Sequence, residues 1–206
     1  MGALSKLEAV NRILRSAGEF PVSTLNSQSN DTLLAVSVLD EQTLYANMEG
    51  SLQNTVYTTI TATSEGFFYL PDTLLHIETT GSDAGKIIST RGSNPTYLYD
   101  VVNNTTNWGD TKSLSVQQVI RLDFDDLPTQ TQFSVCDSSA RMYQMQTVGD
   151  INQDQLLMQQ QMLSDARSKQ ADARSRKANF LWGMNQGPWN ARTTMTGRSF
   201  NPRFGD

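Results

Sequence analysis

The chain has 206 residues, 37% of them hydrophobic, a net charge of −5 and a mean hydropathy of −0.44. The length permits one domain with an inserted or appended subdomain, and the charged fraction of only 18% argues against intrinsic disorder. The single cysteine excludes an intramolecular disulfide, no apolar run approaches the ~20 residues that span a bilayer, and no signal peptide begins the chain, so we expect synthesis in a cytoplasm.

The first predicted element is a short helix with clear ends. Ser5 and Glu8 match the S-x-x-E capping box, which gives partners to two free amide donors. Gly18 stands where a left-handed residue ends a helix, and Pro21 prevents the helix from resuming. One apolar stripe at helical spacing consists of Leu7, Val10, Leu14 and Ala17.

A second helix is expected to begin near Asn30 or Asp31, since both residue types are good N-caps, and to weaken at Gly50. Its predicted apolar face consists of Leu34, Val38, Tyr45 and Met48. The chain therefore opens with two antiparallel helices joined by a turn-rich connection.

From Val56 onward the apolar period changes to two, and β-branched and aromatic residues become frequent. Turn-rich segments separate these runs at roughly ten-residue spacing, which predicts a small antiparallel sheet or a partly open barrel. The expected strands are 56–61, 67–70, 74–79, 86–89, 97–102 and 116–124.

Helical spacing returns at Pro128, which suits a first helical turn, and Asp125 and Asp126 would favour the positive end of that helix dipole. The apolar stripe of this third helix is Phe133, Cys136, Ala140 and Tyr143. A last long helix is expected from about residue 152 to residue 181, with i, i+4 ion pairs of Asp165 with Lys169 and of Asp172 with Arg176. Its apolar face is thin, consisting of Leu156, Leu163, Met158 and Met162, so we expect it to pack against another subunit or protein.

These elements predict an α+β fold, in which two N-terminal and two C-terminal helices form a bundle around an inserted antiparallel β-rich subdomain. The expected parts are N-terminal helices at 1–54, the β-rich insertion at 55–126, C-terminal helices at 127–182 and an extended C-terminal arm at 183–206. The arm is rich in glycine, proline and aromatic residues and is expected to lack a core of its own.

Charge divides along the chain. Residues 1–150 carry 8 basic and 17 acidic residues, a net −9, whereas residues 151–206 carry 8 and 4, a net +4. A basic end on an acidic body suggests an acidic partner, although a solvated helix with mixed charges and an arm folded onto its own subunit remain alternatives. The candidate partner-binding residues are Arg167, Lys169, Arg174, Arg176, Lys177, Trp182, Trp189, Phe200 and Phe204.

No active site emerges from the candidate chemistry, and we expect no catalytic, cofactor-binding or metal-binding residues. His76 is the only histidine, and Cys136 lies on an apolar stripe, where it behaves as a small hydrophobe. Residues 81–86 resemble a phosphate-binding loop but are one residue too short between glycines, and Ile87 replaces the Ser or Thr that would hold a metal, so we interpret the segment as a hairpin turn. The acidic group Asp123, Asp125 and Asp126 precedes a helix and is more simply explained by capping.

One segment carries a family resemblance. The pattern A-V-N-x-I-L-x-S-x-G-E-x-P-V-S-T-L, at residues 9–25, resembles the N-terminal helix and turn of tail tubular protein A, the head-to-tail adaptor of short-tailed bacteriophages. The resemblance implies a structural, non-enzymatic ring of typically twelve subunits in the virion, between the portal and the nozzle (tail tubular protein B). Genomic DNA would pass through the lumen without sequence recognition.

The chain departs from that pattern after the second helix. The family often has a tryptophan entering the first strand, where this chain has Gln53-Asn54-Thr55-Val56-Tyr57, and the C-terminal arm matches no family feature. Two other functions stay open from the sequence: a different neck protein, such as a head-completion or stopper subunit, and a tail hydrolase acting on polysaccharide through Asp123, Asp125 or Asp126.

Overall fold

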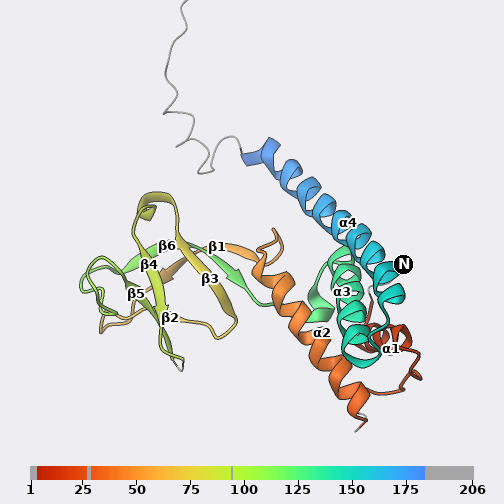
Figure 1. The fold of residues 1–206 in the computed structure, drawn as a ribbon. Coiled ribbons are helices and arrows are strands. Elements are labelled where there is room, and N and C mark those ends of the chain that lie inside the picture. The colour runs from red at the N-terminus through yellow and green to blue at the C-terminus, as the bar shows by residue number, and fades with distance from the viewer. Residues whose placement is uncertain (1–3, 27–28, 94, 184–206) are drawn as a thin grey trace, which may run out of the picture.

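The computed structural model describes residues 4–26, 29–93 and 95–183, with side chains as far as Arg176 (Figure 1). In this part of the chain four helices pack together, and a β-rich region is inserted between the second and third. The predicted α+β architecture of two N-terminal and two C-terminal helices around an antiparallel β insertion is therefore confirmed. The predicted arm at 183–206 lies outside the described residues, apart from Gly183. The helices are α1 (Lys6–Ser16), α2 (Asn30–Met48), α3 (Thr129–Thr147) and α4 (Ile151–Gly183).

The ends of α1 follow the sequence prediction. The Ser5 hydroxyl accepts a hydrogen bond from the Glu8 amide at 3.3 Å, and the Glu8 carboxylate accepts one from the Ser5 amide at 2.9 Å. Gly18 has a φ of +83°, the left-handed conformation that ends a helix at little cost only in glycine. The capping box and stop signal are thus confirmed.

Helix α3 is the centre of the bundle, because α1, α2 and α4 each pack against it. Figure 1 shows α1 and α2 on either side of α3, with α4 running alongside and continuing beyond the bundle. The core that α3 shares with α1 and α2 is apolar. Its fully or almost fully buried members are Ala9, Val10, Ile13, Leu14, Ala35, Leu39, Phe124, Leu127, Val135, Cys136, Ala140 and Tyr143.

The predicted apolar face of α2 is wrong at two positions. Tyr45 is 54% exposed and Met48 is 61% exposed, whereas the small or polar residues Ala35, Thr43 and Asn47 are buried. The close contact with α3 selects small side chains at the buried positions. The predicted stripe, which consisted of the largest apolar residues, is therefore rotated around the helix relative to the face that is buried.

The β insertion contains two three-stranded antiparallel sheets rather than the single sheet or partly open barrel that was expected. The first has the order β1 (Thr55–Thr61), β6 (Ser113–Ile120), β3 (Leu74–Thr79), and the second has the order β2 (Tyr69–Leu70), β5 (Thr96–Asp100), β4 (Ile88–Arg91). Two short 3-10 turns, η1 (Gly81–Asp83) and η2 (Phe124–Asp126), complete the elements. The insertion has its own core of Phe68, Leu70, Ile77, Leu98, Leu114 and Val116, separate from that of the bundle.

Two buried asparagines hold the bundle and the β insertion together where both chain connections pass. Asn47, at the end of α2, is only 1% exposed; its amide donates to the Leu122 carbonyl at 3.0 Å, and its oxygen accepts from the Leu122 amide at 3.1 Å. Asn54 donates to the Asn47 carbonyl at 2.7 Å, and its own carbonyl accepts from the Ile120 amide at 2.9 Å. Buried hydrogen bonds thus join the bundle to the β insertion, while the apolar cores of the two parts stay separate.

Replacing Asn47 with alanine should lower the free energy of unfolding by about 2–4 kcal/mol, because the Leu122 amide and carbonyl lose their partners in a buried place. Denaturant titration of the purified chain measures this change. Asn152→Ala is the matched control, since Asn152 is exposed on α4, and it should change stability by less than about 0.5 kcal/mol. Equal effects of the two substitutions would contradict the role of Asn47.

Candidate functional site

The side chains with catalytic or metal-binding potential are dispersed. His76 is exposed on β3, and among the described residues no group of three or more His, Cys, Asp or Glu side chains is arranged to hold a metal ion. Asp125 accepts a hydrogen bond from the Lys6 amide at 2.8 Å. The prediction that this acidic group caps the following helix α3 is therefore wrong for Asp125, which binds the start of α1. In α3 the N-cap is Pro128, and no side-chain cap hydrogen bond forms there.

Cys136 is fully buried in the bundle core, where its thiol lies 3.8 Å from the Ala9 carbonyl. Burial raises the pKa of this thiol from 9.0 to about 12, with Arg12 opposing the shift. A nucleophilic cysteine needs the opposite, a lowered pKa and solvent access. The side chain therefore acts as a small core hydrophobe.

The glycine-rich segment 81–86 is the connection between β3 and β4. Asp83 forms an ion pair with Lys86 at 2.8 Å and accepts a hydrogen bond from the Ser115 amide at 2.9 Å. The lysine that a phosphate would need is thus paired within the turn. The interpretation of this segment as a hairpin turn is wrong, because β3 and β4 belong to different sheets and do not pair with each other.

The contact between α3 and α4 is polar, in contrast to the apolar contacts that α3 makes with α1 and α2. Arg141 binds Asp154 through two nitrogens, the closer contact being 2.6 Å, and these hydrogen bonds lower the pKa of Asp154. Burial raises the pKa of Asp137, and the guanidinium of Arg12 opposes that rise. The pairs along this seam are Arg141 with Asp154 and Gln161, Ser138 with Gln161, Asp137 with Gln160, Ser134 with Asp165, and Thr131 with Ser168.

Most of the large apolar side chains of α4 are exposed rather than packed in the bundle, Leu157 being the exception. Leu156 is 68% exposed and Leu163 is 60% exposed, and Met158 and Met162 are exposed as well. A surface helix normally directs its apolar residues inward. In α4 this arrangement is reversed, which is typical of a helix whose outer surface is covered by another protein.

The described basic residues of the predicted site divide between two sides of α4. Arg167 is exposed at a recess beside α1, and Arg174 is exposed seven residues further on the same face of the helix; neither forms an ion pair within the described residues. Lys169 and Arg176 are exposed on the side of α2. The side chains of Lys177 and Trp182, and the whole of Trp189, Phe200 and Phe204, lie outside the described part of the structure. The predicted pair of Asp165 with Lys169 is not formed, because Asp165 binds Ser134.

Two recesses border α4. The first lies beside α1, and its lining includes Arg12, Phe133, Leu163 and Arg167. Leu156 and Arg174 are exposed and stand seven residues from Leu163 and Arg167, on the same face of α4; we name these four α4 residues the α1-side flank. We name the second the α2-side groove: it has a volume of about 460 Å³ between α2 and α4, with α3 as its floor. The groove walls include Gln42, Tyr45 and Glu49 of α2 and Lys169, Asp172 and Arg176 of α4.

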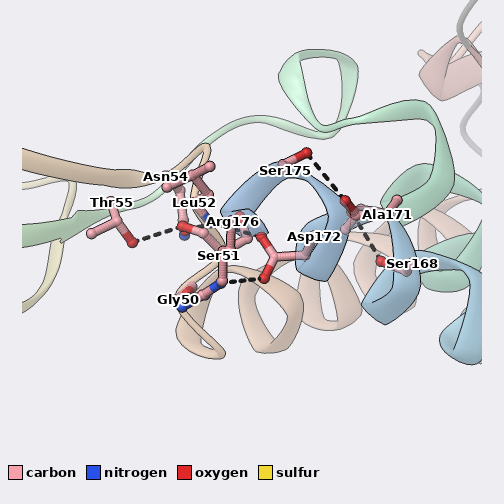
Figure 2. Close-up of polar contacts among 11 residues, drawn as sticks. Gly50, Ser51, Leu52, Asn54, Thr55, Ser168, Ala171, Asp172, Ser175 and Arg176 are labelled. Atoms are coloured by element: carbon pink, nitrogen blue, oxygen red, sulfur yellow. Dashed lines mark hydrogen bonds and ion pairs between the residues drawn. The ribbon is translucent and has the colours of Figure 1, made fainter. Parts of the chain in front are cut away.

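A polar clasp closes one end of the groove (Figure 2). The Asp172 carboxylate accepts a hydrogen bond from the Leu52 amide at 2.9 Å and pairs with Arg176 at 2.7 Å. Arg176 in turn donates to the Gly50 carbonyl at 3.0 Å. Residues 50 and 52 lie in the turn between α2 and β1, so α4 is tied to the segment that leads into the β insertion.

The sequence contained a signal for only part of this site. The i, i+4 spacing of Asp172 and Arg176 predicted their ion pair, which is confirmed, but not their bonds to a turn 120 positions earlier. The groove residues Tyr45, Glu49 and Gln42 were missed. The positions of α4 that face α3 do follow a regular spacing of three and four, namely 154, 157, 161, 164, 168, 171 and 175, and all but Leu157 are polar or small.

A comparison with protein families finds one match: the Tube family model, described as tail tubular protein, matches residues 7–180. The matched region runs from the first turn of α1 across the β insertion to the distal part of α4. No curated protein matches the chain at a significant level. Within the described residues, no helix is both long and apolar enough to cross a membrane.

The raised pKa of Cys136 should make its thiol inert in the folded chain. Labelling by a thiol reagent at pH 8 is expected to be at least about 100-fold slower in the native protein than in denaturant, and free-thiol titration measures both rates. Because the neutral thiol is favoured by folding, its contribution to stability is complete below pH 9 and declines as the pH rises from 9 toward 12. Rapid labelling of native protein would contradict this description.

Replacing Asp172 with alanine should release the turn between α2 and β1 without unfolding the chain. Amide exchange at Leu52 is expected to accelerate by about tenfold or more, while overall stability changes by less than about 1 kcal/mol because the pair is partly exposed. Hydrogen-exchange mass spectrometry measures the turn directly. Arg174→Ala, two positions along the same helix and unpaired among the described residues, is the control; an identical exchange pattern in both variants would exclude the clasp.

Proposed function

The chain belongs to the tail tubular protein family, and from that premise we propose that it is the subunit of a head-to-tail adaptor ring between the portal and the tail nozzle. As a tail tubular protein it is a component of the phage tail and hence of the virion. The family is a structural one, which agrees with a chain that acts by assembly rather than by catalysis.

One structural observation supports assembly most directly: the reversed arrangement of α4. Polar residues of α4 bond to α3, whereas Leu156 and Leu163 are exposed on the outside. An isolated subunit gains nothing from such a surface, whereas a subunit in a ring covers it with a neighbour. The low hydrophobic fraction of 37% is in keeping with a chain that completes its apolar contacts in an assembly.

We assign the parts of the chain to different contacts of this ring, which the family resemblance suggests has twelve subunits. The helices at 1–54 and 127–182 would close the ring, and the β insertion at 55–126 would extend toward neighbours or toward the nozzle. The basic end of α4 and the arm at 183–206 would engage the portal. The supporting observation for the last assignment is the net +4 of residues 151–206 against the net −9 of the preceding residues.

Genomic DNA would leave the capsid through the lumen of this ring. A net charge of −9 on residues 1–150 supports this role, because a wall of negative charge repels phosphates and does not retain the moving duplex. Contact with DNA would then be transient and independent of sequence.

A different neck protein, such as a head-completion or stopper subunit, is the second candidate, since such proteins also present helical bundles to their neighbours. The hydrolase alternative has lost its best support, because Asp125 is bound to the start of α1. Among the acidic trio only Asp123 and Asp126 would be free for chemistry. We expect virions that carry asparagine in place of all three aspartates to degrade polysaccharide to the same extent as wild-type virions.

Co-expression with the cognate portal protein tests the adaptor function. We expect the chain to co-purify with the portal as a ring, seen by electron microscopy directly beneath the portal, and to be present in virions. A head-completion or stopper protein would instead occupy a different position or copy number. A chain that stays monomeric in the presence of portal and is absent from virions would exclude the adaptor; a monomer without portal would not, since such rings can require the portal as template.

A further inference from the structure

We propose that neighbouring copies of this chain meet across α4, with the α1-side flank of one copy seated in the α2-side groove of the next. The inference rests on the ring-forming function proposed above and assigns its subunit interface. The occupant of the groove is therefore a second copy of the same chain, and the contact is made by Leu156, Leu163, Arg167 and Arg174.

The flank and the groove are two different patches on one subunit. The flank borders α1 and the groove borders α2, and these two helices lie on either side of α3. The surfaces therefore face in different directions on one subunit. A contact between two different patches repeats from copy to copy and closes into a ring when the rotation permits, whereas a contact of one patch with itself yields only a pair.

Both sides of the proposed contact carry exposed apolar side chains. Leu156 and Leu163 are seven residues apart and so lie on one line along the flank. Tyr45 is exposed at the groove wall, and Met48 is exposed on the same helix. The seam between α3 and α4 is hydrogen-bonded and leaves the leucines of the flank exposed. A neighbouring copy that buries them would gain the free energy of removing their apolar surface from water.

The two surfaces carry charges of opposite sign. Arg167 and Arg174 on the flank have no acidic partner among the described residues. The described groove lining contains three acids against two bases, and the Glu49 carboxylate forms no ion pair within the same ranges. Unpaired cations on one surface thus meet an excess of acids on the other, which favours this pairing over contact between two flanks.

The apolar and charged residues also follow one another in the same order along α2 and α4. The end of α2 and the distal part of α4 lie together, since the clasp joins Asp172 to Leu52, so the two helices run in the same direction. Following that direction, Tyr45 precedes Glu49 in the groove, and Leu163 precedes Arg167 on the flank. Copies related by rotation about an axis along the bundle keep this direction, so leucine lies against tyrosine and arginine against glutamate.

Disulfide cross-linking within the portal-bound assembly tests the interface. Two single variants, Tyr45→Cys and Leu163→Cys, are mixed, assembled on the portal and oxidised; the buried Cys136 is left in place. We expect a disulfide-linked dimer from the mixture and none from either variant alone. Ile87→Cys mixed with Leu163→Cys is the matched control, because Ile87 is equally exposed but lies in the β insertion.

The outcomes separate this inference from the proposed function. Assembly on the portal with cross-linking no greater than in the Ile87 control overturns the interface and leaves the adaptor function standing. Failure of the wild-type chain to assemble on the portal contradicts both. A dimer formed by Leu163→Cys alone would show that two flanks meet, which also overturns the pairing with the groove.

Charge reversal supplies a second measurement. Arg167→Glu combined with Arg174→Glu should weaken assembly on the portal by about tenfold or more, and Glu49→Arg in the same chain should restore part of it. Arg121→Glu, an exposed reversal outside both surfaces, should have no effect. Circular dichroism confirms that each variant is folded, and an unchanged assembly midpoint for the double reversal would contradict the interface.

Discussion

Three helices pack against α3, and this imposes two different surfaces on one helix. Toward α1 and α2 it presents Val135, Ala140 and Tyr143, whose burial supplies the hydrophobic stabilisation of the bundle. Toward α4 it presents Ser138 and Arg141 among other polar groups, whose hydrogen bonds to α4 replace bonds to water and so add only a modest net stabilisation. The bundle therefore has a firmly packed part of three helices and a fourth helix held mainly by direction-specific polar contacts.

Most of the fold was predictable where the signal is local. The capping box, the left-handed Gly18 and the strand limits of β3 depend only on neighbouring residues, and they agree with the structure. The face of α2 was not predictable by size of the apolar residue, because the separation of two helices decides whether Thr43 or Tyr45 is buried. The junction made by Asn47 was equally hidden, since its partner Leu122 lies 75 positions away.

For the docking site, the sequence identified the helix but not its orientation. Leu156 and Leu163 were expected to mark a thin packing face, and the structure places them on the outside because the polar positions of α4 match hydrogen-bonding partners on α3. Periodicity states which residues share a face, and only the partner helix decides whether that face is buried. The same applies to Arg167 and Lys169: a spacing of two residues already places them on opposite sides of a helix, but only the fold shows that these sides border α1 and α2.

The clasp gives the groove a connection to the rest of the chain. Asp172 and Arg176 hold the turn at Gly50 and Leu52, and a few residues further the junction of Asn47 and Asn54 holds both connections to the β insertion. All these contacts are hydrogen bonds, which have defined directions and can be exchanged for alternative partners at modest cost. A subunit seated in the groove would touch the wall that carries the clasp. The proposed subunit contact would therefore lie against the same turn that leads into the β insertion.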